Sequence, residues 1–113
     1  MRISSKTIIE AVAEVTGISV ADIKGGSKML PISRARQLAI YVMKVHNGDS
    51  HKFIARDLKL GDHTGSVYGF QKIGRLMESD ADTQLTVSLI MRKLDYWTNP
   101  TGNKTLLAAE EVA

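Results

Sequence analysis

Residues 50–77, SHKFIARDLKLGDHTGSVYGFQKIGRLM, contain two amphipathic helical patterns separated by a short turn. The first pattern begins at Ser50, a residue type favoured at helix N-caps, and ends near Leu58. The turn contains Gly61, and the second pattern carries apolar residues at helical spacing: Val67, Phe70, Ile73 and Met77. Two helices joined by a short glycine-containing turn form a helix-turn-helix. The sequence therefore predicts this motif at the centre of the chain.

The N-terminal part of the chain predicts one long helix and one short helical turn. Ser4 or Ser5 caps the long helix, which stops at Gly17. Ser19 begins the short turn, and Gly25-Gly26 ends it. The apolar positions of the long helix are Ile8, Val12 and Val15.

A further helix is predicted on each side of the central motif. Ser33 caps the upstream helix, and Asn47-Gly48 breaks it. Asp80 or Asp82 caps the last helix, which reaches Trp97. The buried positions expected in these two helices are Leu38, Val42 and Val45, and Leu85, Leu89 and Leu94. Strand patterns are almost absent, so the fold class predicted is all-α.

Composition indicates one compact domain. The 113 residues are 43% hydrophobic, which is enough for a core, and we assign residues 1–97 to the domain and 98–113 to a C-terminal tail. The chain has no cysteine, which excludes disulfides and cysteine-bound zinc. It has no apolar run of membrane-spanning length and no export signal at its start, so a soluble, cytoplasmic protein is expected.

Positive charge is concentrated in the first two thirds of the chain. Residues 1–77 hold 12 basic and six acidic residues, a net charge of +6, whereas residues 78–113 hold three basic and six acidic residues, a net charge of −3. A basic surplus beside a helix-turn-helix is what a nucleic-acid-facing surface needs. A solvated basic face without a partner remains the alternative interpretation of charge alone.

Three segments together resemble a known family. They are Ser33-Arg34-Ala35-Arg36-Gln37-Leu38-Ala39, residues 50–58, and Asp62-His63-Thr64 continuing to Lys72-Ile73. Their combination is similar to domain IV, the C-terminal helix-turn-helix DNA-binding domain of the bacterial chromosomal replication initiator DnaA. The resemblance covers residues 4–95 and needs no gap between residues 33 and 73. It implies a compact helical domain of the Trp-repressor-like class and a double-stranded DNA partner.

The resemblance also implies roles for individual residues. The arginine matching Arg36 enters the minor groove, and the residues matching Asp62, His63 and Thr64 read base edges in the major groove. Carboxylate, imidazole and hydroxyl groups can all bond base edges, and an arginine suits a narrow, electronegative minor groove. Lys72 matches a phosphate-binding position. The full set of DNA-binding candidates is Arg34, Arg36, Lys52, Arg56, Asp62, His63, Thr64, Ser66 and Lys72.

Two glycines depart from the family pattern. Gly61 stands where the family has a basic or polar residue, and Gly65 stands where it has a small hydroxyl residue. Both changes remove side chains that flank the reading residues. The sequence therefore predicts DNA binding more firmly than it predicts which sequence is bound. A helical protein-interaction module that has lost its DNA surface is the alternative.

Other site classes find little support. His46 and His51 are five residues apart, which does not place two metal ligands on one helix face. No nucleophile with a separate base is visible, and we expect no enzyme activity. The segment Gly25-Gly26-Ser27-Lys28 lacks the spacing of a phosphate-binding loop, so neither an ATP site nor another cofactor is predicted. We therefore expect a stand-alone bacterial or phage DNA-binding protein that acts as a transcriptional regulator or replication-related factor.

Overall fold

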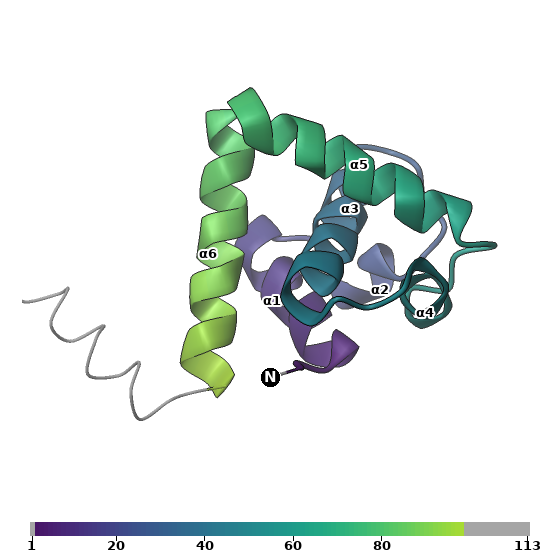
Figure 1. Ribbon diagram of the computed structural model, residues 1–113, viewed down its shortest axis with the longest axis horizontal. Coiled ribbons are helices and arrows are strands. Elements are labelled where there is room, and N and C mark those ends of the chain that lie inside the picture. The colour runs from purple at the N-terminus through teal and green to yellow at the C-terminus, as the bar shows by residue number, and fades with distance from the viewer. Residues whose placement is uncertain (1, 99–113) are drawn as a thin grey trace, which may run out of the picture.

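The computed structural model describes residues 2–98, and every regular element in this range is a helix (Figure 1). No strand occurs in residues 2–98, which confirms the predicted all-α class. No helix among these residues has the length and hydropathy that crossing a membrane requires. The elements are α1 (Ser5–Thr16), α2 (Val20–Ile23), α3 (Ile32–Val42), the π-helical turn η1 (Met43–Asn47), α4 (His51–Asp57), α5 (Thr64–Ser79) and α6 (Ala81–Thr98).

Serine side chains begin three of the helices as the sequence predicts. The hydroxyl oxygens of Ser4, Ser19 and Ser50 each accept the backbone N–H three residues further on, at 3.1–3.2 Å. These bonds satisfy amides that have no partner within the helix. At the other ends, Gly17 and Gly48 adopt the left-handed conformation with φ of 77° and 69°. Glycine adopts this conformation without strain, which explains both stops.

The core lies around α3, which packs against α1 and α5, while α6 runs along α1 (Figure 1). Helices α3 and α5 approach each other closely at Gly69, where an added Cβ would lie only 2.8 Å from Ile40 Cδ1. A side chain at this position would therefore force the end of the buried Ile40 side chain to shift or the two helices to move apart. The largest side chains that are fully buried include Ile8, Ile9, Ile23, Ile40, Met43, Ile54, Leu58, Ile73, Ile90 and Leu94.

Two predictions for the third helix are wrong. The helix begins at Ile32 with Pro31 in the cap position and no side-chain cap, so Ser33 lies inside its first turn. Proline fits a helix start because its φ is already helical and it has no N–H to satisfy. Val45 is 51% exposed, whereas Met43 is fully buried. The π-helical turn rotates the chain relative to an α-helix, which moves Val45 off the buried face.

The last helix buries a different stripe from the one predicted. Asp80 accepts the backbone N–H of Thr83 at 3.0 Å, so the predicted cap is confirmed. Leu85 and Leu89, however, are 59% and 44% exposed. The buried positions are Thr83, Val87, Ile90 and Leu94. Thr98 is the last residue of α6, and the rest of the predicted tail, residues 99–113, lies outside the described residues.

Candidate nucleic-acid interface

The start of α5 presents the predicted reading residues to solvent. Asp62, His63 and Thr64 are all exposed. Asp62 Oδ1 accepts the backbone N–H of Thr64 at 2.9 Å, which fixes the turn one residue before the helix and leaves Oδ2 without a protein donor in the described structure. His63 occupies the cap position without a side-chain cap bond. Three polar side chains at an exposed helix start are thus free to meet a base edge or a phosphate.

Helices α4 and α5 are joined through buried polar and aromatic contacts. His51 Nδ1 lies 2.8 Å from Ser66 Oγ, and Ser66 is fully buried. The ring of Phe70 lies edge-on to His51 at 5.9 Å and is stacked on Tyr41 at 5.5 Å. These contacts fix how α5 projects from α4. Ser66 faces the inside of the motif, so its predicted contact with DNA does not fit the structure.

The environment of His51 favours the neutral imidazole. Burial lowers the pKa of His51 from its usual 6.5, and the positive charges of Lys44 and His63 lower it further. A neutral imidazole can form the hydrogen bond with the hydroxyl of Ser66. A protonated imidazole would place another positive charge near Lys44 and His63. The joint between α4 and α5 is therefore sensitive to the charge of this histidine.

A groove of about 670 Å³ lies beside the start of α5. Its walls come from the loop before α3, from α3, from the turn before α5 and from the first half of α5. Lys28 lines it from the loop, Arg34 from α3 and Lys72 from α5, and Thr64 lines it from the helix start. The groove therefore combines base-reading groups with cations, as a DNA surface requires. Its remaining lining residues are Leu30, Ser33, Arg36, Gln37, Ile40, Leu60, Gly65 and Tyr68.

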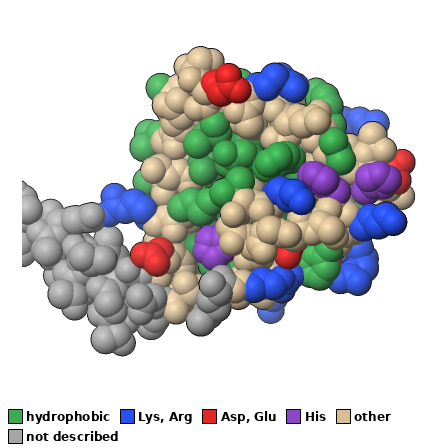
Figure 2. All heavy atoms as spheres, in the orientation of Figure 1, with side chains coloured by type: hydrophobic (Ala, Val, Ile, Leu, Met, Phe, Trp, Pro, Cys, Tyr) green, Lys and Arg blue, Asp and Glu red, His purple; other side chains and the backbone are tan. Residues whose placement is uncertain are grey.

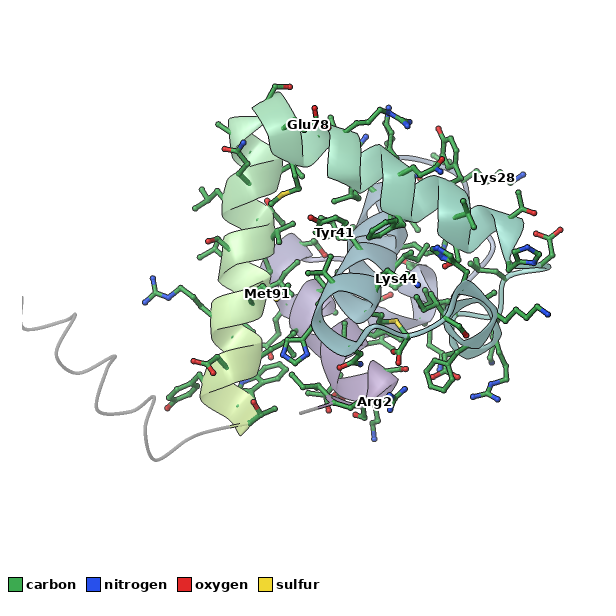
Figure 3. The ribbon with its side chains drawn as sticks, viewed as in Figure 1. Arg2, Lys28, Tyr41, Lys44, Glu78 and Met91 are labelled. Atoms are coloured by element: carbon green, nitrogen blue, oxygen red, sulfur yellow. The ribbon has the colours of Figure 1, made fainter. Side chains whose placement is uncertain are left out.

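Lys28 and Tyr68 line this groove but are absent from the DNA-binding candidates predicted from the sequence. Lys28 projects from the loop before α3 on the side of α5's first turns (Figure 3). Tyr68 is 56% exposed and lies one turn after Thr64 on α5. The helical spacing from Thr64 to Tyr68 was the available signal for the tyrosine. The position of Lys28 depends on how its loop folds back toward α5, and no local pattern indicates that.

Arg36 does not fit the role that the resemblance implied. Arg36 is only 7% exposed, and its burial lowers the pKa of the guanidinium below its usual range. Nε donates to the carbonyl oxygen of Ile23 at 2.7 Å, Nη1 to Ser27 at 2.6 Å and Nη2 to Asp22 at 3.0 Å. To enter a minor groove the guanidinium would have to break all three bonds. In this structure Arg36 fixes the loop between α2 and α3 instead.

The other basic candidates divide between two sides of the motif. Arg34 lies in the groove and donates from Nε to Gln37 Oε1 at 3.2 Å. Lys52 is exposed in the first turn of α4. Arg56 lies over the ring of Phe53 at 4.8 Å and does not line the groove. In Figure 2 basic side chains lie beside histidines on the side where α5 begins, while another histidine and further basic side chains lie elsewhere on this face.

Comparison with known proteins agrees with this geometry. The family model for the bacterial DnaA protein helix-turn-helix matches residues 5–73, more than half of the chain. The chain belongs to the bacterial DnaA helix-turn-helix family. The matched range includes α1 to α4, the turn with Asp62 and His63, and α5 as far as Ile73. Membership of this family supports DNA binding by the chain.

The relatives of this DnaA-type domain are much longer proteins. The chromosomal replication initiator protein DnaA of Picosynechococcus is 36% identical over 89 residues, which cover 79% of this chain and 20% of the relative. The DnaA proteins of Gloeothece citriformis and Nostoc punctiforme are each 33% identical, over 81% and 90% of this chain. The chain thus spans about a fifth of the length of these relatives.

Proposed function

We propose that this DnaA-type chain binds double-stranded DNA sequence-specifically at sites that resemble initiator boxes. The observation that carries the proposal is the exposed Asp62-His63-Thr64 start of α5 beside a groove lined by Lys28, Arg34 and Lys72. The hydroxyl, imidazole and carboxylate groups supply base contacts, and the three cations supply phosphate contacts. In this proposal the chain acts as a small transcriptional regulator or a replication-related factor in the cytoplasm.

Fluorescence anisotropy with labelled duplexes tests the proposal. The full chain is titrated with an initiator-box duplex and a scrambled duplex at two salt concentrations. We expect tighter binding to the box, and weaker binding to both duplexes at the higher salt because bound phosphates release counterions. Absence of both specific and salt-dependent binding would contradict DNA binding.

Single substitutions separate base contacts from phosphate contacts. His63→Ala is expected to cost about 1–3 kcal/mol on the preferred duplex and little on the scrambled one. Lys72→Ala is expected to weaken both duplexes alike and to lower the salt slope by about 1. Lys93→Ala is the control, because it removes the same charge from α6, where Lys93 pairs with Glu14 at 3.4 Å. Equal effects of all three substitutions on both duplexes would refute the assigned roles.

A protein-interaction module with a lost DNA surface is the second candidate. The observation that favours it is the lack of side chains around the helix start. Gly61 has no atom within 4 Å of an added Cβ, and Gly65 has only Leu60 Cδ1 at 3.6 Å. There is room for the family's larger residues at both positions, yet neither is present. This second candidate is favoured if the parent chain binds no duplex and the Gly61→Arg variant binds the initiator-box duplex.

A further inference from the structure

A second cleft lies apart from the groove beside α5. It has a volume of about 370 Å³ and opens between the first turns of α1, the end of α2 and the end of α4. No residue of α5 lines it, so it is distinct from the surface that carries the reading residues. Its lining residues are Ser5, Lys6, Ile9, Lys24, Arg56, Asp57 and Lys59.

Positive charge exceeds negative charge on the walls of this cleft. Four cations and one carboxylate line it, a net charge of +3 that equals the net charge of the whole chain. The carboxylate, Asp57, is already paired with Arg56 at 3.5 Å. Within residues 2–98, no carboxylate lies within ion-pair distance of Lys6, Lys24 or Lys59. Like charges that share a concave surface repel one another, and a bound anion removes that repulsion.

The first two residues of α1, Ser5 and Lys6, line the same cleft. Helix α1 has 12 residues and no acidic side chain in its first turn, so the positive end of its dipole is not neutralised. Ser4 caps the N–H of Thr7, which leaves the first amides of the helix available. Ser5, at the first helical position, is only 9% exposed, and its hydroxyl has no hydrogen-bond partner in the structure. A buried hydroxyl without a partner is uncommon, and Ser5 is one of the residues that line the cleft.

Lys59 is held in an unusual backbone conformation at the edge of the cleft. Its φ is 58°, in the left-handed region that glycine adopts more easily than lysine. Its N–H donates to the carbonyl oxygen of Arg56 at 3.2 Å, and the N–H of Leu60 donates to Ala55 at 2.8 Å. The turn is therefore defined by the backbone. Replacement of Lys59 by glycine would remove the charge and keep the turn.

We propose that this cleft binds a compact anion with two or more phosphate groups, such as inorganic diphosphate or the diphosphate end of a nucleotide. Three unpaired lysines and the end of α1 match a ligand that carries several negative charges close together. The volume fits a small molecule. A DNA strand seated on α5 is the less favoured source of phosphate, because the cleft is concave and has no lining residue from that helix.

Isothermal titration of the full chain with inorganic diphosphate at low salt tests the proposal. We expect saturable binding of one diphosphate per chain, and at least tenfold weaker binding of inorganic phosphate because it engages fewer cations. A nucleoside diphosphate is titrated in parallel. If the nucleoside diphosphate binds about as tightly as inorganic diphosphate, the cleft recognises the phosphate groups alone. If the nucleoside diphosphate binds much more tightly, the ligand is a nucleotide.

Two lysines of one loop provide a matched pair of variants. Lys24 lines the cleft, whereas Lys28, four residues later, lines the groove beside α5. Lys24→Gln and Lys59→Gly are each expected to weaken diphosphate binding at least fivefold, and Lys24→Arg is expected to restore it. Lys28→Gln is expected to leave diphosphate binding unchanged. Circular dichroism confirms that each variant remains folded.

DNA binding by the same variants distinguishes the two sources of phosphate. The Lys24→Gln variant should bind a short initiator-box duplex with the same affinity as the parent chain. If diphosphate does not bind the parent chain saturably, or if Lys28→Gln weakens it as much as Lys24→Gln, the proposal is overturned. A loss of duplex affinity in Lys24→Gln without any diphosphate binding would instead assign the cleft to flanking DNA phosphates. A failure of the box duplex to bind would leave the diphosphate results interpretable, because they need no DNA.

Discussion

The contact between α3 and α5 at Gly69 provides the sharpest test of how the fold is built. A Cβ at this position would lie 2.8 Å from Ile40 Cδ1 and 3.3 Å from Gln37 Cγ. Ile40 is 2% exposed and β-branched, so its side chain has little room to move away. Gly74, five residues later in α5, has no atom within 4 Å of an added Cβ. The two glycines thus share a helix and differ in their packing.

The expected effects of the two alanine substitutions differ in size and in sign. Alanine in place of glycine inside a helix gains about 0.8–1 kcal/mol from helix propensity. Overpacking of a filled core costs about 1–3 kcal/mol. Gly74→Ala should therefore stabilise the chain by about 1 kcal/mol. Gly69→Ala should be neutral to destabilising by about 2 kcal/mol, so that the variants differ by about 1–3 kcal/mol.

Urea unfolding followed by circular dichroism measures this difference directly. The comparison uses the parent chain and both variants, with the dependence on urea checked to be equal in all three. A Gly69→Ala chain as stable as the Gly74→Ala chain would refute the close approach of α3 and α5. Loss of duplex binding in Gly69→Ala, with binding retained in Gly74→Ala, would further show that helix spacing shapes the groove beside α5.

Three further predictions concern buried or titrating groups. Arg36→Gln leaves up to three carbonyl oxygens without their donor and should lower the free energy of unfolding by about 2–4 kcal/mol in urea titrations, whereas a loss under about 0.5 kcal/mol would contradict a structural role. Because the pKa of His51 is lowered from 6.5 in the folded chain, the unfolded chain binds more protons just below that pH. Stability should therefore fall as the pH drops below about 6.5, and His51→Asn should reduce this fall in thermal unfolding scans. Hydrogen bonds from the hydroxyl and the N–H of Thr83 lower the pKa of Asp80 from its usual 3.8 in the folded chain. The stability that this cap provides should therefore be fully present above pH 3.8 and be lost as the pH falls through the lower pKa of the folded chain. Asp80→Ala should abolish that part of the acid dependence, and an unchanged acid profile would argue against the cap.

Local signals in the sequence were sufficient for most helix ends. A serine cap acts on an amide three residues away, so Ser4, Ser19 and Ser50 could be identified from spacing alone. Ser33 was misidentified because Pro31 begins the helix without any side-chain bond. Helix α6 has two sets of apolar residues at helical spacing, one with Leu85 and Leu89 and the other with Val87 and Ile90. Periodicity does not tell which stripe packs against α1.

The candidate interface was predictable only where it is local. The exposed Asp62-His63-Thr64 turn follows from its own sequence. The role of Arg36 does not, because its three acceptors lie nine to 14 residues earlier in the chain. Ser66 was included among the DNA-binding candidates, yet it is fully buried and its Oγ lies 2.8 Å from His51 Nδ1.

The groove beside α5 depends on two residues to which we assign no contact with DNA. Gly69 allows α5 to lie close against α3, and Arg36 holds the loop that carries Lys28. The first contact sets the distance between the two helices, and the second sets the position of the loop relative to both. Substitutions at Gly69 and Arg36 should therefore change DNA affinity through the shape of the groove, with losses on every duplex sequence, whereas substitutions at His63 should change the preference between sequences.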